Sequence, residues 1–265
     1  MGLSSLFGPK LPIDGEELEF QLATFKWLLR EFGAPAQDGL ITATPAFFPS
    51  AGRRGVEVLF EEVRAAAGMA DWPCDLREGD RDREVDAGNA HLIRHAAAPA
   101  PCGTFHIAED LPGRPAVITY NPGLVNDTGA MIATFAHELG HYLMATAEGT
   151  PPGGWDLHEL HTDLAAVYLG FGIFLANSAR NFRQFHGAGE MGWSSGGQGY
   201  LSEGALVTAL VIAERLAGRD ATAAAPHLKT YLKGELKRAA KALARRHPDM
   251  AGAVAAIDLS QFAGD

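Results

Sequence analysis

The stretch TFAHELGHYLM, residues 134–144, contains the pattern H-E-x-x-H at His137, Glu138 and His141. Residues four apart lie on one face of an α-helix, so the two histidines can direct ring nitrogens at one point about 2 Å from each. Glu138 lies about 100° around the helix, where it cannot comfortably join them as a ligand but can contact a water molecule held at that point. The stretch therefore predicts a helix that holds a metal ion beside a general base.

The residues before this helix predict a small sheet. GTFHI (103–107) and AVITY (116–120) are rich in β-branched and aromatic residues, and the segment between them contains Pro and Gly. This pattern is typical of a β-hairpin. Asn126 or Asp127 can then cap the motif helix.

Other segments predict further helices and one loop. Helical spacing of apolar residues and capping residues predict helices over 14–33, 56–69, 160–174 and the region from Ser202 onward. The charged run 75–86 predicts an exposed loop. We therefore expect one mainly helical α+β domain over residues 1–265. Its N-terminal α+β lobe would cover about 1–150 and its helical C-terminal lobe about 155–265.

Composition narrows the class of protein. The chain is 47% apolar and 20% charged, as in an ordinary globular protein, and its formal net charge is −10. This charge argues against a nucleic-acid partner, because phosphate binding needs a basic surface. One basic series predicts a solvated helix face: Lys233, Lys237, Lys241 and Arg245.

The cysteines and the apolar runs bear on localisation. Only Cys74 and Cys102 occur, and the first ten residues lack the apolar core of a secretion signal. We therefore expect a cytoplasmic protein, and whether the two thiols pair stays open. We predict no membrane span, because no apolar run of about 18 residues is free of charge or a helix breaker.

A third metal ligand is predicted on the next helix. Glu159 and Asp163 are four residues apart beside an apolar stripe, where two carboxylates are costly to bury without a partner. We expect Glu159 to be the third ligand and Asp163 to accept a hydrogen bond from the other ring nitrogen of His137. His158 or His161 could compete for the ligand position, and Asp156 is a weaker candidate.

These residues resemble the zincin group of zinc metallopeptidases. The resemblance at the first stretch includes the residues around the motif: Thr134, Phe135, Leu139, Gly140, Tyr142 and Leu143. With Glu159 and Asp163, the arrangement is similar to the gluzincin branch, the thermolysin-like enzymes, in which H-E-x-x-H is followed on a second helix by E-x-x-x-D.

Two related patterns do not fit. The metzincin pattern fails because its glycine position is Met144 and its third histidine position is Ala147. The aspzincin pattern fails because its aspartate position is Gly153. More loosely, residues 162–178 look like a group of uncharacterised bacterial H-E-x-x-H proteins. That likeness supports a metal site and names no substrate.

The resemblance implies a zinc-dependent peptidase with a zincin-like fold. One Zn²⁺ ion would be held by His137, His141 and Glu159, with one position left open. Glu138 would take a proton from water during attack on the peptide carbonyl and pass it to the leaving amine.

The resemblance also implies where a peptide or protein substrate binds. Zincins commonly hold the substrate as a strand added to the sheet edge ahead of the metal helix, which here would be residues 115–120, with Ile118 and Tyr120 in contact. Tyr200 and His227 are candidates, by side-chain chemistry alone, for a donor to the developing oxyanion.

Two other functions stay open. The chain could be a zinc-binding regulatory or binding protein on the same scaffold without peptidase turnover, or it could hydrolyse a small non-peptide amide. Glu138 favours an enzyme, because a structural zinc site needs no base and is normally closed by four protein ligands. The sequence does not disclose the natural substrate or the oligomeric state.

Overall fold

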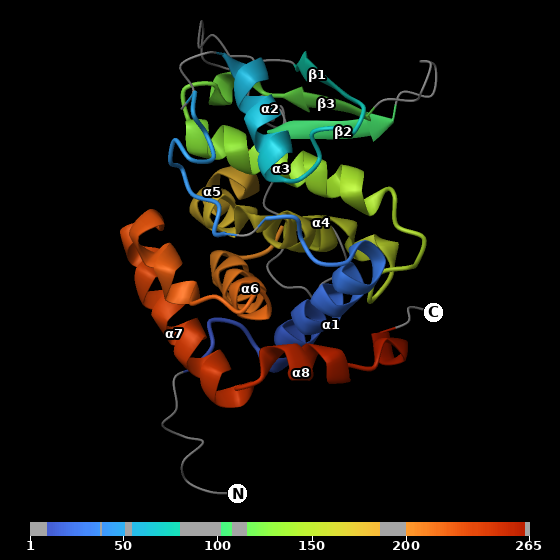
Figure 1. The fold of residues 1–265 in the computed structure, drawn as a ribbon, viewed down its shortest axis with the longest axis vertical. Helices are drawn as coiled ribbons and strands as arrows, with labels where there is room; N and C mark the ends of the chain where they lie inside the picture. The colour runs from blue at the N-terminus through green and yellow to red at the C-terminus, as the bar shows by residue number, and fades with distance from the viewer. Residues whose placement is uncertain are drawn as a thin grey trace, which may run out of the picture.

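The computed structural model consists of helices stacked beneath a small sheet (Figure 1). It describes residues 10–37, 39–50, 55–79, 102–107, 116–185 and 200–262, with backbone alone for 180–185. Within these residues the chain is α+β and mostly helical, which confirms the predicted mainly helical α+β class. The longer helices are α1 (Gly15–Phe32), α2 (Val56–Ala66), α3 (Thr128–Met144), α4 (His158–Ala166), α5 (Gly172–Phe185), α6 (Glu203–Leu216), α7 (Thr230–Arg246) and α8 (Met250–Ala256).

Short helical turns connect these elements. They are η2 (Pro122–Leu124), η3 (Trp155–Leu157), η4 (Val167–Phe171), η5 (Ala221–His227) and η6 (Leu259–Phe262).

The sheet has three strands, β1 (Cys74–Glu78), β2 (Gly103–Ile107) and β3 (Ala116–Tyr120), in the order β1-β3-β2. β2 and β3 pair antiparallel, which confirms the predicted hairpin. β1 pairs parallel to β3 on its other side. β3 is therefore the central strand, and within the described residues β1 and β2 are the two edges.

This arrangement corrects two predictions. Residues 75–78 belong to β1 and not to an exposed loop, because backbone pairing with β3 stabilises the strand although its side chains are largely polar. The second error concerns β3, which is not a sheet edge. Its residues Ala116, Val117 and Ile118 are fully buried, and both of its sides are paired.

Helix α3 lies between the sheet and the helices below it (Figure 1). Its first turn is capped by Asp127, whose side chain accepts a hydrogen bond from the Ala130 N–H. Most of its residues are buried on every side, as expected for a helix covered by other elements on both faces. At Gly140 a Cβ atom would lie only 2.9 Å from the carbonyl oxygen of Thr162, so this glycine permits close contact between α3 and α4.

Helix α1 packs with helices from the second half of the chain. It contacts α4, α6 and α8, so the chain's N-terminal segment joins the helical layer far from the sheet. The predicted ends are confirmed: Asp14 caps the first turn and Gly33 ends the helix with φ of 79°. Lys26 fixes α8 to α1 through hydrogen bonds to the carbonyls of Ala255 and Ile257.

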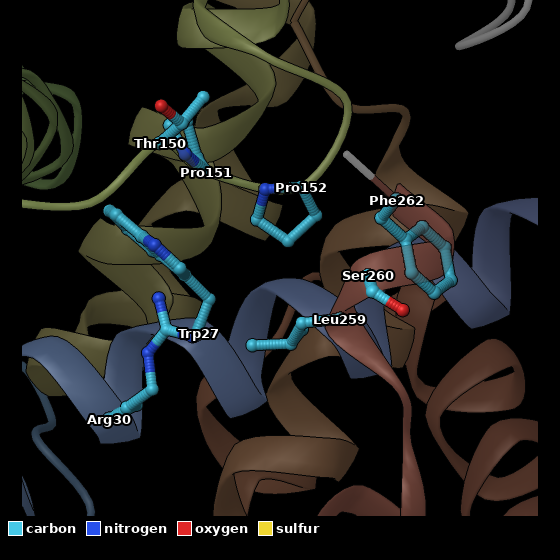
Figure 2. Close-up of a pocket in the computed structure, with 8 residues that line it drawn as sticks. All are labelled: Trp27, Arg30, Thr150, Pro151, Pro152, Leu259, Ser260 and Phe262. Atoms are coloured by element: carbon cyan, nitrogen blue, oxygen red, sulfur yellow. The ribbon is translucent and has the colours of Figure 1, made fainter. Parts of the chain in front are cut away.

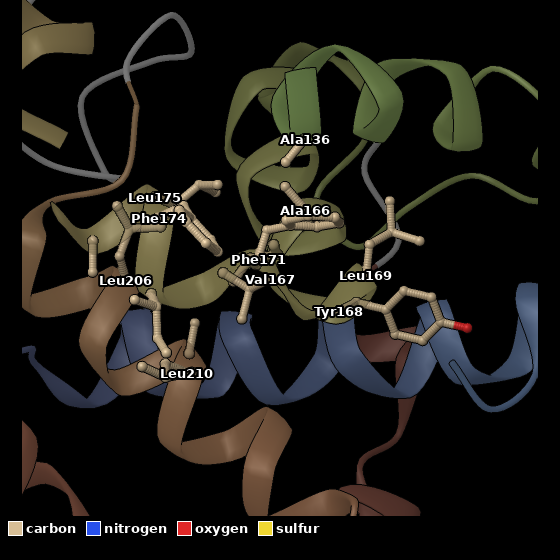
Figure 3. Packing of buried hydrophobic residues seen from close by; sticks show 14 of the residues in the cluster. Ala136, Ala166, Val167, Tyr168, Leu169, Phe171, Phe174, Leu175, Leu206 and Leu210 are labelled. Atoms are coloured by element: carbon tan, nitrogen blue, oxygen red, sulfur yellow. The ribbon is translucent and has the colours of Figure 1, made fainter. Parts of the chain in front are cut away.

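The predicted helix over 160–174 is interrupted by the π-helical turn η4. Gly170 adopts φ of 98°, and a Cβ atom there would lie 2.7 Å from Nε2 of Gln37. Figure 3 shows Val167 and Phe171 of this turn packed in the core near Leu206 and Leu210 of α6.

The apolar character of this region also meets a test for membrane helices. The helical run Trp155–Ala179 is long and apolar enough to span a membrane by length and composition alone. However, 89% of its most apolar window is buried inside the protein, as is usual for a core helix. This run also carries Glu159 and Asp163.

Three further features complete the fold. A pocket of about 440 Å³ lies between α1, the loop before η3 and the C-terminal turn η6, and its lining includes Trp27, Pro152 and Phe262 (Figure 2). Cys74 and Cys102 do not form a disulfide with each other in the structure. The basic series of α7 lies on its solvent side as predicted, with three residues exposed and one partly exposed: Lys237, Lys241, Arg245 and Lys233.

Candidate metal centre

The structure brings His137, His141 and Glu159 together between α3 and α4. Oε2 of Glu159 lies 3.2 Å from Nε2 of His137 and 3.5 Å from Nε2 of His141. Zinc–ligand bonds of about 2.0–2.1 Å give a tetrahedron with edges of about 3.3 Å, so both separations suit two ligands of one ion. His137 is buried, and the other two keep partial solvent contact. The group could hold a metal ion.

Asp163 lies behind His137, where the sequence predicts it. Its Oδ1 is 3.0 Å from Nδ1 of His137, and its Oδ2 accepts a hydrogen bond from the Leu201 N–H at 2.8 Å. Burial alone lowers the pKa of His137, but the hydrogen bonds to Asp163 and Glu159 outweigh burial and raise it to about 10. The surroundings of this ring therefore favour positive charge, whether from a proton or from a metal.

The sequence prediction missed Thr162. Its hydroxyl oxygen lies 3.1 Å from Nδ1 of His141, and its O–H donates to the carbonyl of His158 at 2.8 Å. Each histidine of the group thus has a partner on α4 at the ring nitrogen that faces away from Glu159. The spacing of Thr162, three residues after Glu159 on the same helix, was a signal that could have found it.

Glu138 is buried beside this group, and its Oε2 has no hydrogen-bond partner. The pKa of its carboxyl is raised from 4.5 to about 7. Burial is the largest cause of this rise, the charge of His137 opposes it and the charge of Glu159 adds to it. Gly103 of β2 leaves the room that this side chain occupies. A Cβ atom at Gly103 would lie 2.8 Å from Oε1 of Glu138 and 2.7 Å from Cγ2 of Thr134. The sequence prediction did not include Gly103.

Tyr200 and His227, the two predicted oxyanion donors, lie in different surroundings. The centre of the Tyr200 ring is 5.2 Å from that of His137, and burial with nearby carboxylates, led by Glu159, raises the pKa of its hydroxyl well above the usual range. His227 is exposed at the end of η5, and its carbonyl accepts a hydrogen bond from Asn177. Among the contacts described, none joins His227 to the metal group.

The competing ligands lie outside the group of three. His158 is 49% exposed, and its Nε2 lies 3.3 Å from Oε1 of Glu159, whereas Oε2 is the oxygen in contact with His137 and His141. His161 is buried and turned toward α1, with its Nδ1 3.4 Å from the Thr24 hydroxyl and its ring against Phe20. Asp156 is exposed in η3.

The substrate contacts predicted at Ile118 and Tyr120 lose their basis, because both side chains are buried in the central strand. The edge nearest the metal group is β2 instead. The Phe105 ring lies 6.3 Å from the His141 ring and 5.6 Å from the Tyr142 ring.

The hydrogen-bond pattern shows which backbone groups of β2 face outward. The Asn121 N–H donates to the Cys102 carbonyl, and hydrogen-bonded pairs alternate along an antiparallel ladder. The N–H and C=O groups of Gly103, Phe105 and Ile107 therefore point away from β3. In the described part of the chain, no strand pairs with this outer edge.

Comparison with known proteins gives no match: no family model, no curated protein and no solved structure matches the chain significantly. The geometry of the site is therefore the basis for proposing a function.

Proposed function

We propose that the chain is a zinc-dependent peptidase of zincin type. The observation that carries this proposal is the convergence of His137, His141 and Glu159, with Glu138 next to His137 on the same helix and its Oε2 without a hydrogen-bond partner. Two imidazoles and a carboxylate are a ligand set typical of catalytic zinc sites, which keep a fourth position for water or substrate.

His137, His141 and Glu159 would hold the zinc ion, which when bound would act as a Lewis acid toward water and the substrate carbonyl. Glu138 accepts a proton at its carboxylate from the attacking water and then gives it to the leaving nitrogen. The Glu138 side chain is buried beside the ligand group, where a carboxylate can take up this proton and give it back. Tyr200, held protonated by its raised pKa, donates a hydrogen bond to the developing oxyanion.

The free edge of β2 is the proposed binding site for an extended peptide. The outward backbone groups of Gly103 and Phe105 can pair with a substrate strand, which would lie beside the part of α3 that carries Glu138 and His141. Phe105 and Tyr142 offer aromatic surface at the same edge. Recognition would then rest on the substrate's main chain and one apolar side chain.

A zinc-binding regulatory protein is the second candidate, and the position of His158 bears on it. A closed structural site needs a fourth protein ligand. Nε2 of His158 approaches Oε1 of Glu159, and among the described residues this histidine is not part of the ligand group. This arrangement favours an open position and hence the enzyme.

The experiment combines metal analysis with a digest of a peptide library. We expect about one zinc ion per chain in the wild type and in His106→Ala, which removes an exposed histidine on the other face of β2, and none in His137→Ala. We expect the wild type to cut peptides and Glu138→Gln to retain zinc without cutting. Folded wild-type protein without stoichiometric metal would overturn the site. Bound metal without cutting that depends on Glu138 would establish the regulatory alternative.

A further inference from the structure

Thr162 makes two polar contacts through one hydroxyl group. Its oxygen lies 2.8 Å from the carbonyl oxygen of His158 and 3.1 Å from Nδ1 of His141, and the residue is fully buried. A hydroxyl carries a single hydrogen, and a carbonyl oxygen can only accept. The hydrogen of Thr162 is therefore given to His158, and the oxygen of Thr162 must accept the N–H of His141.

These hydrogen bonds place a hydrogen on Nδ1 of the His141 ring. A neutral imidazole with its hydrogen on Nδ1 carries a lone pair on Nε2, which here faces Oε2 of Glu159. Asp163, which is an acceptor when ionised, imposes the same arrangement on His137 through its Nδ1. When a metal ion takes the place of any hydrogen on the two Nε2 atoms, their lone pairs and Oε2 of Glu159 can converge on it.

We propose that Thr162 is a positioning residue that fixes the tautomer and orientation of His141 for metal binding. The proposal rests on the metal site of the proposed function. Thr162 contacts Nδ1 of His141 just as Asp163 contacts Nδ1 of His137. Two consecutive residues of α4 therefore orient both histidines of α3. Partners of this kind typically change metal affinity by about 10- to 100-fold when removed.

Thr162 also packs at the close contact between α3 and α4, and two substitutions separate packing from hydrogen bonding. The methyl group of Thr162 would lie 3.2 Å from a Cβ atom placed at Gly140. Thr162→Val keeps this methyl group and removes the oxygen. Thr162→Ser keeps the oxygen and removes the methyl group. Thr208→Val is the matched control, because Thr208 is equally buried and donates to the carbonyl four residues before it, at Gly204, within α6.

The first measurement is the zinc dissociation constant, determined by competition with a chromogenic chelator. We expect Thr162→Val to weaken zinc binding about 10- to 100-fold. Thr162→Ser should stay within about threefold of the wild type, and Thr208→Val should match it. Equal affinity in Thr162→Val and the wild type would overturn the proposal. A loss in Thr162→Ser as large as in Thr162→Val would also overturn it, because packing would then account for the effect.

The second measurement reads the tautomer directly in metal-free protein. Long-range ¹H–¹⁵N spectra of the histidine rings are expected to show the His141 hydrogen on Nδ1 in the wild type and a shift toward Nε2 in Thr162→Val. A wild-type ring with a hydrogen on Nε2 and none on Nδ1 refutes the proposal even if Thr162→Val does not fold. This readout needs no zinc, so a wild type that binds no metal would defeat the proposed function while the spectra still judge Thr162.

Discussion

The substitution Glu138→Gln should make the stability of the metal-free protein less sensitive to pH. Burial raises the pKa of Glu138 from 4.5 to about 7, although the charge of His137 lowers it; the charge of Glu159 adds to the rise. A carboxyl group with a raised pKa in the folded state stabilises the fold fully below about pH 4.5, and this contribution is lost as the pH rises through about 7. At about 1.36 kcal/mol per pKa unit, the loss amounts to about 3 kcal/mol. Glutamine does not titrate and avoids this loss.

The assay is urea unfolding of both proteins at pH 5 and pH 8 in the presence of a chelator. We expect the free energy of unfolding of Glu138→Gln, minus that of the wild type, to increase by about 2.5 kcal/mol between these two pH values, because part of the loss has already occurred at pH 5. Glu19→Gln, which changes an exposed glutamate of α1, is the control and should show the same difference at both. A difference for Glu138→Gln that does not change with pH would refute the claim that burial raises the pKa of this carboxyl.

Two glycine substitutions test the spacing around the site. Gly103→Ala places a Cβ atom 2.8 Å from Oε1 of Glu138, so we expect about 1–3 kcal/mol lower stability and a loss of peptide cutting with zinc retained. Gly140→Ala places a Cβ atom 2.9 Å from the Thr162 carbonyl, which should separate α4 from α3 and weaken zinc binding in a chelator competition. Gly234→Ala in α7 meets only Arg238 at 3.8 Å and should be neutral or stabilising by about 0.4–1 kcal/mol in urea unfolding. If Gly103→Ala and Gly140→Ala both keep the stability and the zinc affinity of the wild type, the close packing at these two glycines is contradicted.

The sequence predicted the site residues whose positions depend on a single helix. The cap at Asp127 and the four-residue spacing of His137 and His141 are local features, and the structure reproduces both. The spacing of Glu159 and Asp163 likewise places both side chains on one face of α4. Packing of α4 against α3 is then enough to bring these two carboxylates to the two histidines.

Features set by neighbours distant in sequence could not be predicted in the same way. The order of strands depends on which segments pair, and the composition of residues 75–78 contains no sign of β1. This pairing makes β3 central and moves the free edge to β2. The need for glycine at position 103 likewise arises only when β2 lies against α3. The residues around Gly103 in the sequence do not show that the Glu138 side chain will lie beside it.

The surroundings of Glu138 bear on the choice between an enzyme and a protein that only holds metal. A buried carboxylate oxygen without a partner destabilises the fold, and the glycine at 103 leaves β2 without a side chain that could pack there. A site that only retains zinc requires neither feature and is more stable when closed by a fourth ligand. Both features lie together where the outward backbone of β2 would bring a peptide bond. This combination supports the proposed hydrolysis, since a general base needs a carboxylate oxygen that no protein group occupies.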